Sequence, residues 1–414
     1  MCSVLERHHG FLGGVTGPVA AGGASLAAGA PLLAPHTALA GPLPAGTLEG
    51  EELARLPGKQ PLLKRGFRPP NYETPVAEFA SVITPNDRFF VRWHLMGISE
   101  VDAREWRLSI GGDATSKPFE LTLEQLKSEF EPVEVVAVCQ CSGNRRGLSD
   151  PHVPGVEWGY GAMGNARWKG ARLKDVLARA GLAKEAVEIA FDGADRPALD
   201  VTPDFVKSIP VWKALDENTI IAYEMNGTAL PHHNGYPARL VVPGWTATYW
   251  MKQVVSIQAL SKPLSNFWMA TAYRIPKGKF AFADRFTSQE NETTTPITEM
   301  LVNSVITSHT DGTSVGRDKP LLLKGLAWDA GSGIRRVEIS RDGGRVWEAA
   351  DLGSDLGRFS FRTWQFALNP ASAGPLVLMA RATNRQGSTQ VSELIFNNPG
   401  YHNNVIQSVT VNVV

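Results

Sequence analysis

The sequence predicts an α+β protein in which a mixed domain is followed by an all-β domain. Helix and strand patterns alternate up to about residue 290, where β-branched strand runs stand beside capped helical stretches. From about Ile297 onward the pattern is one of short alternating strands separated by turn residues. The sequence contains neither a dinucleotide-binding fingerprint nor a Walker loop, so a nucleotide-binding α/β fold is not expected.

Length and charge limit the classes of protein to consider. The 414 residues leave room for two or three domains, and 43% hydrophobic with 20% charged residues is an ordinary globular composition. Because 41 basic residues balance 41 acidic ones, the bulk charge indicates no nucleic-acid partner, and only local basic clusters would attract an anionic ligand. Cys139 and Cys141 are the only thiols besides Cys2, so no disulfide framework is expected.

The N-terminal region is predicted to be an export signal followed by an extended arm. Residues 7–12 (RHHGFL) precede a long Gly/Ala-rich stretch, and residues 38–40 (ALA) offer a small-residue cleavage site. We therefore interpret residues 1–40 as an export signal and residues 41–75 as an arm lying over the surface. No later stretch reaches the roughly 20 apolar residues that a membrane span needs.

Strand signals recur through the mixed domain, which we place at residues 76–290. They occur at residues 89–95, 106–112, 133–138, 187–191 and 220–223. Alternation in the first of these strands places Arg92 and His94 on one face. A solvated polar sheet face is the ordinary alternative for such a pair.

Two helices are predicted between these strands. Thr122 and Gln125 form a capping box for a helix that continues to Phe130. A second helix, at residues 173–180, ends at Gly181 as its C-terminal cap.

The stretch from residue 133 to residue 168 carries the strongest chemical signal. Its β-branched start predicts a buried strand, which ends in Cys139-Gln140-Cys141. Arg145 and Arg146 follow, so a thiolate or an anion held here would lie in a positive field. From residue type alone, the thiols could instead be small buried hydrophobic residues, a disulfide that extended-strand geometry disfavours, or part of a zinc site that lacks a second cysteine pair.

Residues 140–146 (QCSGNRR), 155–159 (GVEWG) and 166–170 (ARWKG), in this order, resemble the sulfite oxidase family of molybdenum enzymes. The resemblance implies that Cys141 is the thiolate ligand of molybdenum, while Cys139 is left as a packing residue. Residues 90–94 (FVRWH) resemble a second block of the family. This block implies that Arg92 contacts the oxo side of the metal site and that His94 holds the pterin phosphate.

Further blocks of the same family imply the remaining cofactor contacts. Residues 223–227 (YEMNG) and the segment that follows them imply that Arg239 and Lys252 bind the pterin. Asn234 stands where the family often has a histidine, so His233 is expected to substitute. Additional pterin candidates are Lys207 and Ser208. Tyr273 matches the active-site tyrosine of the family, whose phenol would orient a substrate oxygen.

The all-β part, residues 291–414, has the strand spacing of an immunoglobulin-like sandwich. Its strands are expected at residues 321–328, 337–340, 346–347, 376–383 and 409–413. It resembles the C-terminal domain of the family, which forms the dimer contact in many members. The fold class is thus α+β, with a sulfite-oxidase-type molybdopterin domain before the sandwich, and a homodimer or heterodimer is possible.

The resemblance implies the oxidation of sulfite to sulfate by oxygen-atom transfer at a molybdenum held by one molybdopterin. Arg92, Arg146 and Trp158 would form the anion pocket. No haem-attachment motif C-x-x-C-H is present, so the electrons are expected to pass to a separate acceptor such as a c-type cytochrome. The leader resembles a twin-arginine signal with His8 and His9 in place of the arginines, which implies the periplasm.

Two other function classes stay open at this point. The same scaffold could reduce another oxyanion or an S-oxide, or it could be a cofactor-free binding protein. One departure bears on the substrate pocket. Residues 398–404 (NPGYHNN) resemble the family segment that sends an arginine into that pocket, yet they contain none. Asn403 is expected at that place, with His402 as the alternative.

Overall fold

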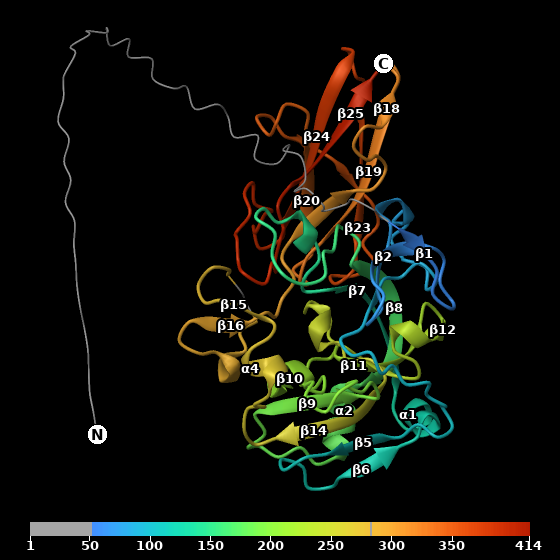
Figure 1. Cartoon of the computed structure of the whole chain (residues 1–414), viewed down its shortest axis with the longest axis vertical. Coiled ribbons are helices and arrows are strands. Elements are labelled where there is room, and N and C mark those ends of the chain that lie inside the picture. Colours follow the sequence, from blue (N-terminus) through green and yellow to red (C-terminus); the bar gives the residue numbers. More distant parts are fainter. Residues whose placement is uncertain (1–51, 282–283) are drawn as a thin grey trace, which may run out of the picture. The chain divides into compact units, whose positions relative to one another are not determined.

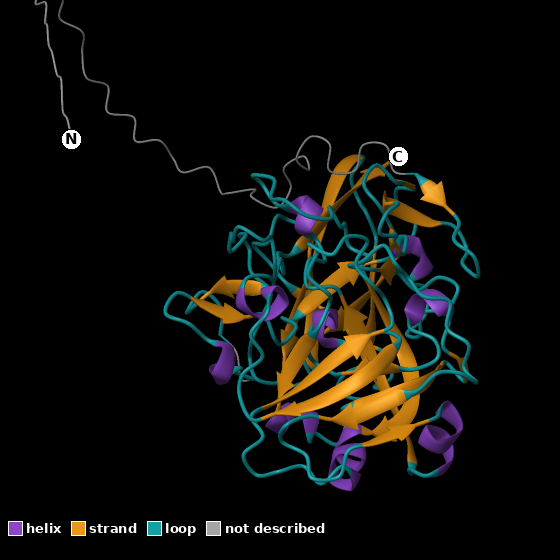
Figure 2. Ribbon diagram, turned by 60° about the horizontal axis from the view of Figure 1, so that its bottom comes forward, coloured by secondary structure: helices purple, strands orange, loops and turns teal. Residues whose placement is uncertain are grey.

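The computed structural model describes residues 52–281 and 284–414. The predicted export signal therefore lies outside the described residues, as does the start of the predicted arm. Strands dominate the described part, and its helices are short (Figures 1 and 2). The chain is α+β, as the sequence predicts.

The segment predicted to be an extended arm contributes, within residues 52–75, three strands of a four-stranded sheet, and residues 91–92 supply the fourth. The four strands lie in the order β1-β2-β3-β4. Their bounds are β1 (Leu53–Ala54), β2 (Leu62–Gly66), β3 (Asn71–Glu73) and β4 (Val91–Arg92). Leu62, Tyr72, Val91 and Trp93 form a small hydrophobic cluster of their own, so apolar residues between the prolines and glycines give this segment a core.

Two larger sheets form the mixed domain. One has the order β10-β9-β14-β5-β6, and the other has the order β12-β11-β8-β7 with β13 beside β11. The strands are β5 (Leu108–Gly111), β6 (Phe119–Leu121), β7 (Pro132–Gln140), β8 (Met163–Arg172), β9 (Glu188–Gly193), β10 (Lys207–Pro210), β11 (Ile220–Met225), β12 (Thr228–Ala229), β13 (Arg239–Val241) and β14 (Val254–Leu260). All pairs are antiparallel except β14 with β5. The predicted strands at 106–112, 133–138, 187–191 and 220–223 are thus confirmed with small changes in their bounds.

Both predicted helices are present. The capping box of α1 (Leu123–Ser128) is complete, because Gln125 donates its backbone N–H to the Thr122 hydroxyl and accepts the Thr122 N–H in return. α2 (Leu173–Arg179) ends just before Gly181, whose φ of 66° is left-handed. The other short helices are η1 (Val76–Glu78), η2 (Arg146–Leu148), α3 (Val211–Ala214), η3 (His232–Asn234), η4 (Ala247–Tyr249), α4 (Phe267–Ala270) and η5 (Thr287–Gln289).

The C-terminal part is a sandwich of two sheets, and several strands of both are labelled in Figure 1. Their orders are β17-β19-β23-β22 and β18-β25-β24-β20-β21. The strands are β17 (Asn303–Ile306), β18 (Ser314–Val315), β19 (Leu321–Trp328), β20 (Ile334–Ser340), β21 (Glu348–Ala349), β22 (Asp351–Leu352), β23 (Arg362–Leu368), β24 (Gly374–Asn384) and β25 (Gln407–Val413). A separate hairpin of β15 (Arg274–Pro276) and β16 (Thr294–Pro296) precedes it. Side chains from both sheets share one hydrophobic cluster, as an immunoglobulin-like sandwich requires.

Strand β7 joins the two parts of the fold because its two faces have different neighbours. Val138 belongs to a cluster with Phe361 and Trp328 of the sandwich, and Gln140 accepts the Trp328 indole N–H at 2.6 Å. Cys139 belongs instead to the core of the mixed domain. Strand alternation at the end of β7 thus directs Val138 and Gln140 to the sandwich and Cys139 to the mixed domain.

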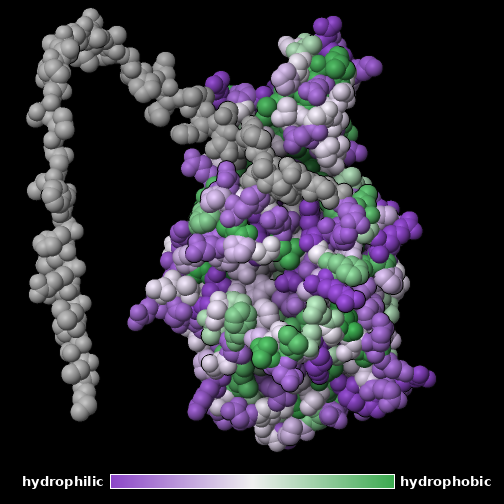
Figure 3. All heavy atoms as spheres, in the orientation of Figure 1, coloured by the Kyte–Doolittle hydropathy of each residue, from purple (hydrophilic) through white to green (hydrophobic). Residues whose placement is uncertain are grey.

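The described surface gives no sign of a membrane-spanning helix. None of the helices at residues 52–281 and 284–414 is both long and apolar enough to cross a bilayer. Figure 3 shows hydrophilic side chains over most of the visible face, with hydrophobic ones scattered between them.

Candidate active site

Cys141 lies immediately beyond the end of β7 in a fixed backbone. Its N–H donates to the Ala162 carbonyl at 2.9 Å, and its own carbonyl accepts the Asn144 N–H at 3.0 Å. The side chain is 8% exposed and lines a cavity. The predicted delivery of a thiol at the end of a rigid strand is therefore what the structure shows.

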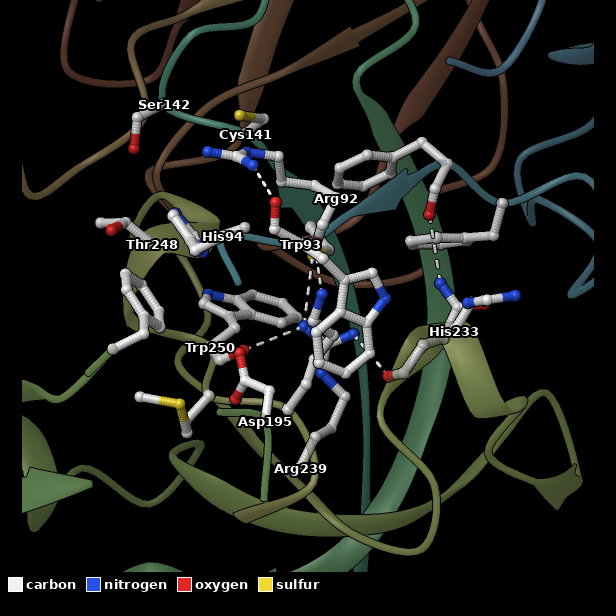
Figure 4. A pocket seen from close by; sticks show the side chains of 18 of the residues that line it. Arg92, Trp93, His94, Cys141, Ser142, Asp195, His233, Arg239, Thr248 and Trp250 are labelled. Atoms are coloured by element: carbon white, nitrogen blue, oxygen red, sulfur yellow. Dashed lines mark hydrogen bonds between the residues drawn. The ribbon is translucent and has the colours of Figure 1, made fainter. Parts of the chain in front are cut away.

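The cavity encloses about 640 Å³ of empty space, part of which is open to solvent. Figure 4 shows Cys141 at the upper edge of the view and Arg239 at the lower edge, with Trp93 and Trp250 between them. The wall consists of Phe89, Phe90, Arg92, Trp93, His94, Cys139, Cys141, Ser142, Asp195, Phe205, His233, Asn234, Arg239, Ala247, Thr248, Trp250, Met251, Lys252 and Tyr273.

Arg239, at the start of β13, is a buried cation in this wall. Its guanidinium donates to the carbonyls of Asn234 at 2.9 Å and Trp250 at 3.2 Å, and it lies 5.0 Å from the centre of the Trp168 ring. Gly235, with a φ of 111°, allows this approach, because a Cβ there would lie 3.0 Å from the Arg239 Cβ. A fixed positive charge is thus presented to the cavity.

Lys252 places a second cation beside it. Its ammonium lies 3.6 Å from the centre of the Trp93 ring and donates to the Arg92 carbonyl. Burial lowers the pKa of Lys252 well below its usual value, and Arg239 lowers this pKa further. The nearby Asp195 carboxylate raises the pKa of Lys252, because its negative charge favours the protonated ammonium.

Cys139 lies within β7 and, like Cys141 just beyond the strand, lines the cavity. Its sulfur accepts a hydrogen bond from the Arg239 guanidinium at 3.8 Å. Burial raises the pKa of the Cys139 thiol to about 11, so the group is a protonated thiol at neutral pH. Cys139 is therefore packed in the core, as expected, but at the cavity wall.

The loop before β13 contributes His233 and Asn234. Burial lowers the pKa of His233 to about 4, so its imidazole is neutral near pH 7. The Asn234 side chain is hydrogen-bonded to Lys59 of the N-terminal segment, whose ammonium donates to the Asn234 Oδ1 at 2.5 Å. The same ammonium donates to the Asn86 and Phe89 carbonyls, at 2.6 and 3.0 Å. Lys59 thus ties the N-terminal segment to the cavity wall.

Tyr273, His94 and Arg92 meet at the other side of the cavity. The Tyr273 hydroxyl shares a hydrogen bond with the His94 Nε2, and the His94 ring stacks on Phe205 with centroids 3.7 Å apart. Burial raises the pKa of the Tyr273 phenol, whereas Arg92 lowers it. Tyr273 has a φ of 58°, an uncommon value for a non-glycine residue and one that marks functional sites in many proteins. The predicted strand at 89–95 is reduced to β4, yet Arg92 and His94 line the same cavity.

Hydrogen-bond donors without partners indicate what the cavity accommodates. Trp93 Nε1, Arg239 Nε and Thr248 Oγ1 are buried and have no partner among the described residues, and the same holds for His233 Nδ1. Buried polar atoms are normally paired, so several unpaired ones around one cavity indicate an oxygen-rich ligand. A pterin with a phosphate fits this wall, and the Cys141 thiol is the soft ligand that molybdenum would need.

Four other predicted site residues lie outside the cavity wall. The Lys207 ammonium donates to the Trp268 carbonyl at 2.7 Å and faces the Tyr273 ring at 5.2 Å, so it supports Tyr273 from behind. The Ser208 hydroxyl donates to Glu188 at 2.6 Å. Trp158 is fully buried, and its indole N–H has no partner among the described residues. Arg146 contacts the C-terminal segment, at the Pro399 carbonyl and the Tyr401 ring.

The C-terminal segment contacts this region in a way that corrects one expectation. Asn403 does not replace a pocket arginine, because its amide donates to the Arg145 carbonyl at 3.1 Å. The ring of His402 packs against Phe280. Two other groups of this segment contact Arg146 instead. The Tyr401 ring centre lies 5.1 Å from its guanidinium carbon, and its Nε donates to the Pro399 carbonyl at 2.8 Å.

Replacing Gly400 with alanine is expected to raise the KM for the substrate about three- to tenfold with the fold retained. Gly400 has a φ of 62°, and an added Cβ would lie 2.4 Å from the Val153 Cγ2 and 2.8 Å from the Arg146 Cγ, so both side chains must shift. Steady-state kinetics test this. Gly343→Ala is the matched control, since Gly343 has a φ of 74° but open space around it. An equal change in both variants would show that backbone strain alone is responsible.

Sequence reasoning missed several residues of the wall. Asp195 follows β9, and Trp93 and Trp250 flank the cavity beside residues that were predicted. Trp93 and Trp250 are neighbours of His94 and of Lys252, which is a signal that could have been used. Asp195 and Lys59 carry no local signal of this kind, because they are brought in by loops from distant parts of the chain.

Comparisons with known proteins agree with this geometry. The family "Oxidoreductase molybdopterin binding domain" matches residues 95–268, and the "Mo-co oxidoreductase dimerisation domain" matches residues 294–414. The mitochondrial sulfite oxidase of Rattus norvegicus is 33% identical over 86% of this chain and 67% of its own length. The nitrate reductase of Hordeum vulgare is 29% identical over 87% of this chain and 42% of its own length. The crystal structure of the sulfane dehydrogenase SoxCD from Paracoccus pantotrophus matches with a TM-score of 0.69 and 27% identity, covering 83% of this chain and 87% of that one.

The fold and the site thus define a molybdopterin oxidoreductase, built from a cofactor-binding domain and a dimerisation domain. The chain belongs to the sulfite oxidase family of molybdenum enzymes. It spans about two thirds of the length of the rat enzyme and less than half of the barley enzyme.

Proposed function

We propose that this protein oxidises sulfite to sulfate and passes the electrons to a separate acceptor. The observation that carries the proposal is the single cavity in which the Cys141 thiol, Arg92 and Tyr273 lie together. A thiol suited to a soft metal and a cation suited to an oxyanion are thereby held at one place. The balanced reaction converts sulfite and water into sulfate, two protons and two electrons.

The cavity wall offers separate groups to hold the cofactor. Arg239, Lys252, His233 and His94 would bind the pterin and its phosphate, since charge-assisted hydrogen bonds to phosphate are the strong ones. Cys141 would ligate molybdenum as a thiolate. Once bound, the molybdenum cofactor would supply the two-electron and oxygen-atom-transfer chemistry, which no protein side chain provides.

The remaining residues act on the substrate. The Arg92 guanidinium would bind a sulfite oxygen and compensate its charge, because an unpaired dianion is costly to bury. Tyr273 would donate its phenol proton in a hydrogen bond to the same anion, with His94 fixing the phenol orientation. Trp158 and Arg146 would close the anion pocket from behind.

The test is a measurement of metal content followed by assays on the purified protein. We expect about one molybdenum and one pterin per chain and sulfite-dependent reduction of ferricyanide. Nitrate and methionine sulfoxide, offered with a chemical reductant, are expected to react far more slowly. Faster turnover of nitrate would favour a reductase, an alternative that the similarity to nitrate reductase keeps relevant. Protein without molybdenum or pterin, even when expressed with cofactor supply, would favour a cofactor-free binding protein.

The partners belong to the same proposal. The match to a dimerisation domain supports a dimer through the sandwich. A c-type cytochrome is the proposed acceptor, because it takes electrons one at a time at a protein surface. Reduction of a purified cytochrome c in the sulfite assay, and the mass of the protein in solution, would test these two points.

We also propose that the protein is exported to the periplasm, and that its leader is a poor twin-arginine signal. His8 and His9 lack the permanent charge of arginine near neutral pH. The double variant His8→Arg, His9→Arg is therefore expected to raise the periplasmic fraction several-fold. Cell fractionation measures it, with cytoplasmic activity as the reference. Equal export of both chains would contradict the role assigned to the histidines.

A further inference from the structure

Tyr401 lies between two groups of the proposed substrate pocket. Its ring stacks on Tyr273 with centroids 5.7 Å apart and planes 8° from parallel. The Arg146 guanidinium lies over the same ring at 5.1 Å from its centre. Tyr401 comes from the segment between β24 and β25, so the C-terminal domain supplies it to a site built by the other domain.

The backbone of Tyr401 is held firmly in this position. Its N–H donates to the Asn397 side chain at 2.9 Å, and its carbonyl accepts the Asn397 amide at 2.8 Å. The residues on both sides, Gly400 and His402, have positive φ values of 62° and 57°. At His402, which is not a glycine, this conformation is strained, and such strain persists where the surroundings determine one conformation.

The Tyr401 hydroxyl forms no hydrogen bond with a described residue, although Tyr401 is only 7% exposed. Burial raises the pKa of this phenol, so it stays protonated, and Tyr273, Arg146, Cys141 and Arg92 are all close enough to act on it electrostatically. The groups around it are thus those that surround the expected place of the substrate.

We propose that the Tyr401 hydroxyl donates a hydrogen bond to the oxyanion substrate and so helps to set its affinity. It provides the contact from the second domain for which an arginine was expected, but without a charge. Compared with a pocket that has an arginine at this place, this pocket has one positive charge fewer and attracts anions less at long range. The affinity for the anion should therefore depend less on the salt concentration. This inference deepens the proposed function and rests on the site binding an oxyanion.

The test is Tyr401→Phe in the cofactor-loaded enzyme, which removes the hydroxyl but keeps both ring contacts. We expect the KM for sulfite and the dissociation constant of sulfate to rise about 10- to 100-fold, as the loss of one hydrogen bond to a charged group implies, with kcat within about twofold. Tyr160→Phe is the matched control, because Tyr160 is a tyrosine whose ring lies 4.8 Å from the Arg145 guanidinium. That variant should leave both constants unchanged.

Two readouts separate this inference from the proposed function. Sulfate or nitrate binding to the oxidised enzyme, measured by calorimetry, does not require turnover. If the wild type does not oxidise sulfite but binds either anion more tightly than Tyr401→Phe, the proposed function fails and the role of Tyr401 stands. If sulfite oxidation is present and Tyr401→Phe matches the wild type in KM and in sulfate affinity, the role of Tyr401 is overturned. Absence of any oxyanion binding by the wild type overturns both.

Discussion

Cys141→Ser is expected to abolish sulfite oxidation while leaving the fold intact. Cys139 and Cys141 both line the cavity, and in the proposed arrangement Cys141 supplies the soft thiolate ligand of molybdenum. Changes to groups that merely support a metal ligand cost about 10- to 100-fold, so loss of the ligand itself should exceed about 100-fold in kcat/KM. Activity, molybdenum content and the circular dichroism spectrum of the purified variant are the measurements.

Cys139→Ser is the internal control for this prediction. Both thiols line the cavity, but the Cys139 sulfur is already a hydrogen-bond acceptor for Arg239. A serine hydroxyl can accept the same N–H, so this variant should keep its molybdenum and most of its activity. Its free energy of unfolding should fall by about 1–3 kcal/mol at most. Equal loss of activity in both variants, with metal retained in both, would contradict the assignment of Cys141 as the ligand.

Arg239→Met is expected to purify with little or no cofactor. The guanidinium is 3% exposed, and its Nε has no partner among the described residues, so it is available to a phosphate. A hydrogen bond to a charged group contributes about 1.5–3 kcal/mol, which corresponds to roughly 10- to 100-fold in affinity. Molybdenum and pterin per chain, measured after gel filtration, give the result.

Two further variants serve as controls for that result: Arg239→Lys at the same position and Arg179→Met at a distant one. Lysine keeps the charge but loses the planar pair of donors, so cofactor content should be intermediate. Arg179 lies on the exterior, where its guanidinium contacts Glu129 and the Phe119 ring, and its loss should leave cofactor content unchanged. Full cofactor content in Arg239→Met would show that the phosphate end of the cofactor lies elsewhere.

The sequence by itself determined much of the scaffold and the centre of the site. The capping box at Thr122, the stop at Gly181 and the strand that ends just before Cys141 are local signals, in which a few consecutive residues decide the backbone. Ordered motifs around Cys141, His94 and Arg239 identified the family, and those three residues do line one cavity. Local pattern is sufficient here because strand alternation fixes which side chains share a face.

Only the tertiary structure decided how distant segments complete the site. Lys59 bonds Asn234 across 175 residues of chain, and Arg146 bonds the Pro399 carbonyl across 253. In the segment around Tyr401, the direction of each side chain depends on positive φ values and on the hydrogen bonds of Asn397. Alignment of the motif therefore predicted Asn403 as the residue that reaches the pocket, whereas Tyr401 is the one that contacts Arg146. Periodicity carries no information on such contacts, because they depend on how loops from separate domains pack together rather than on the order of neighbouring residues.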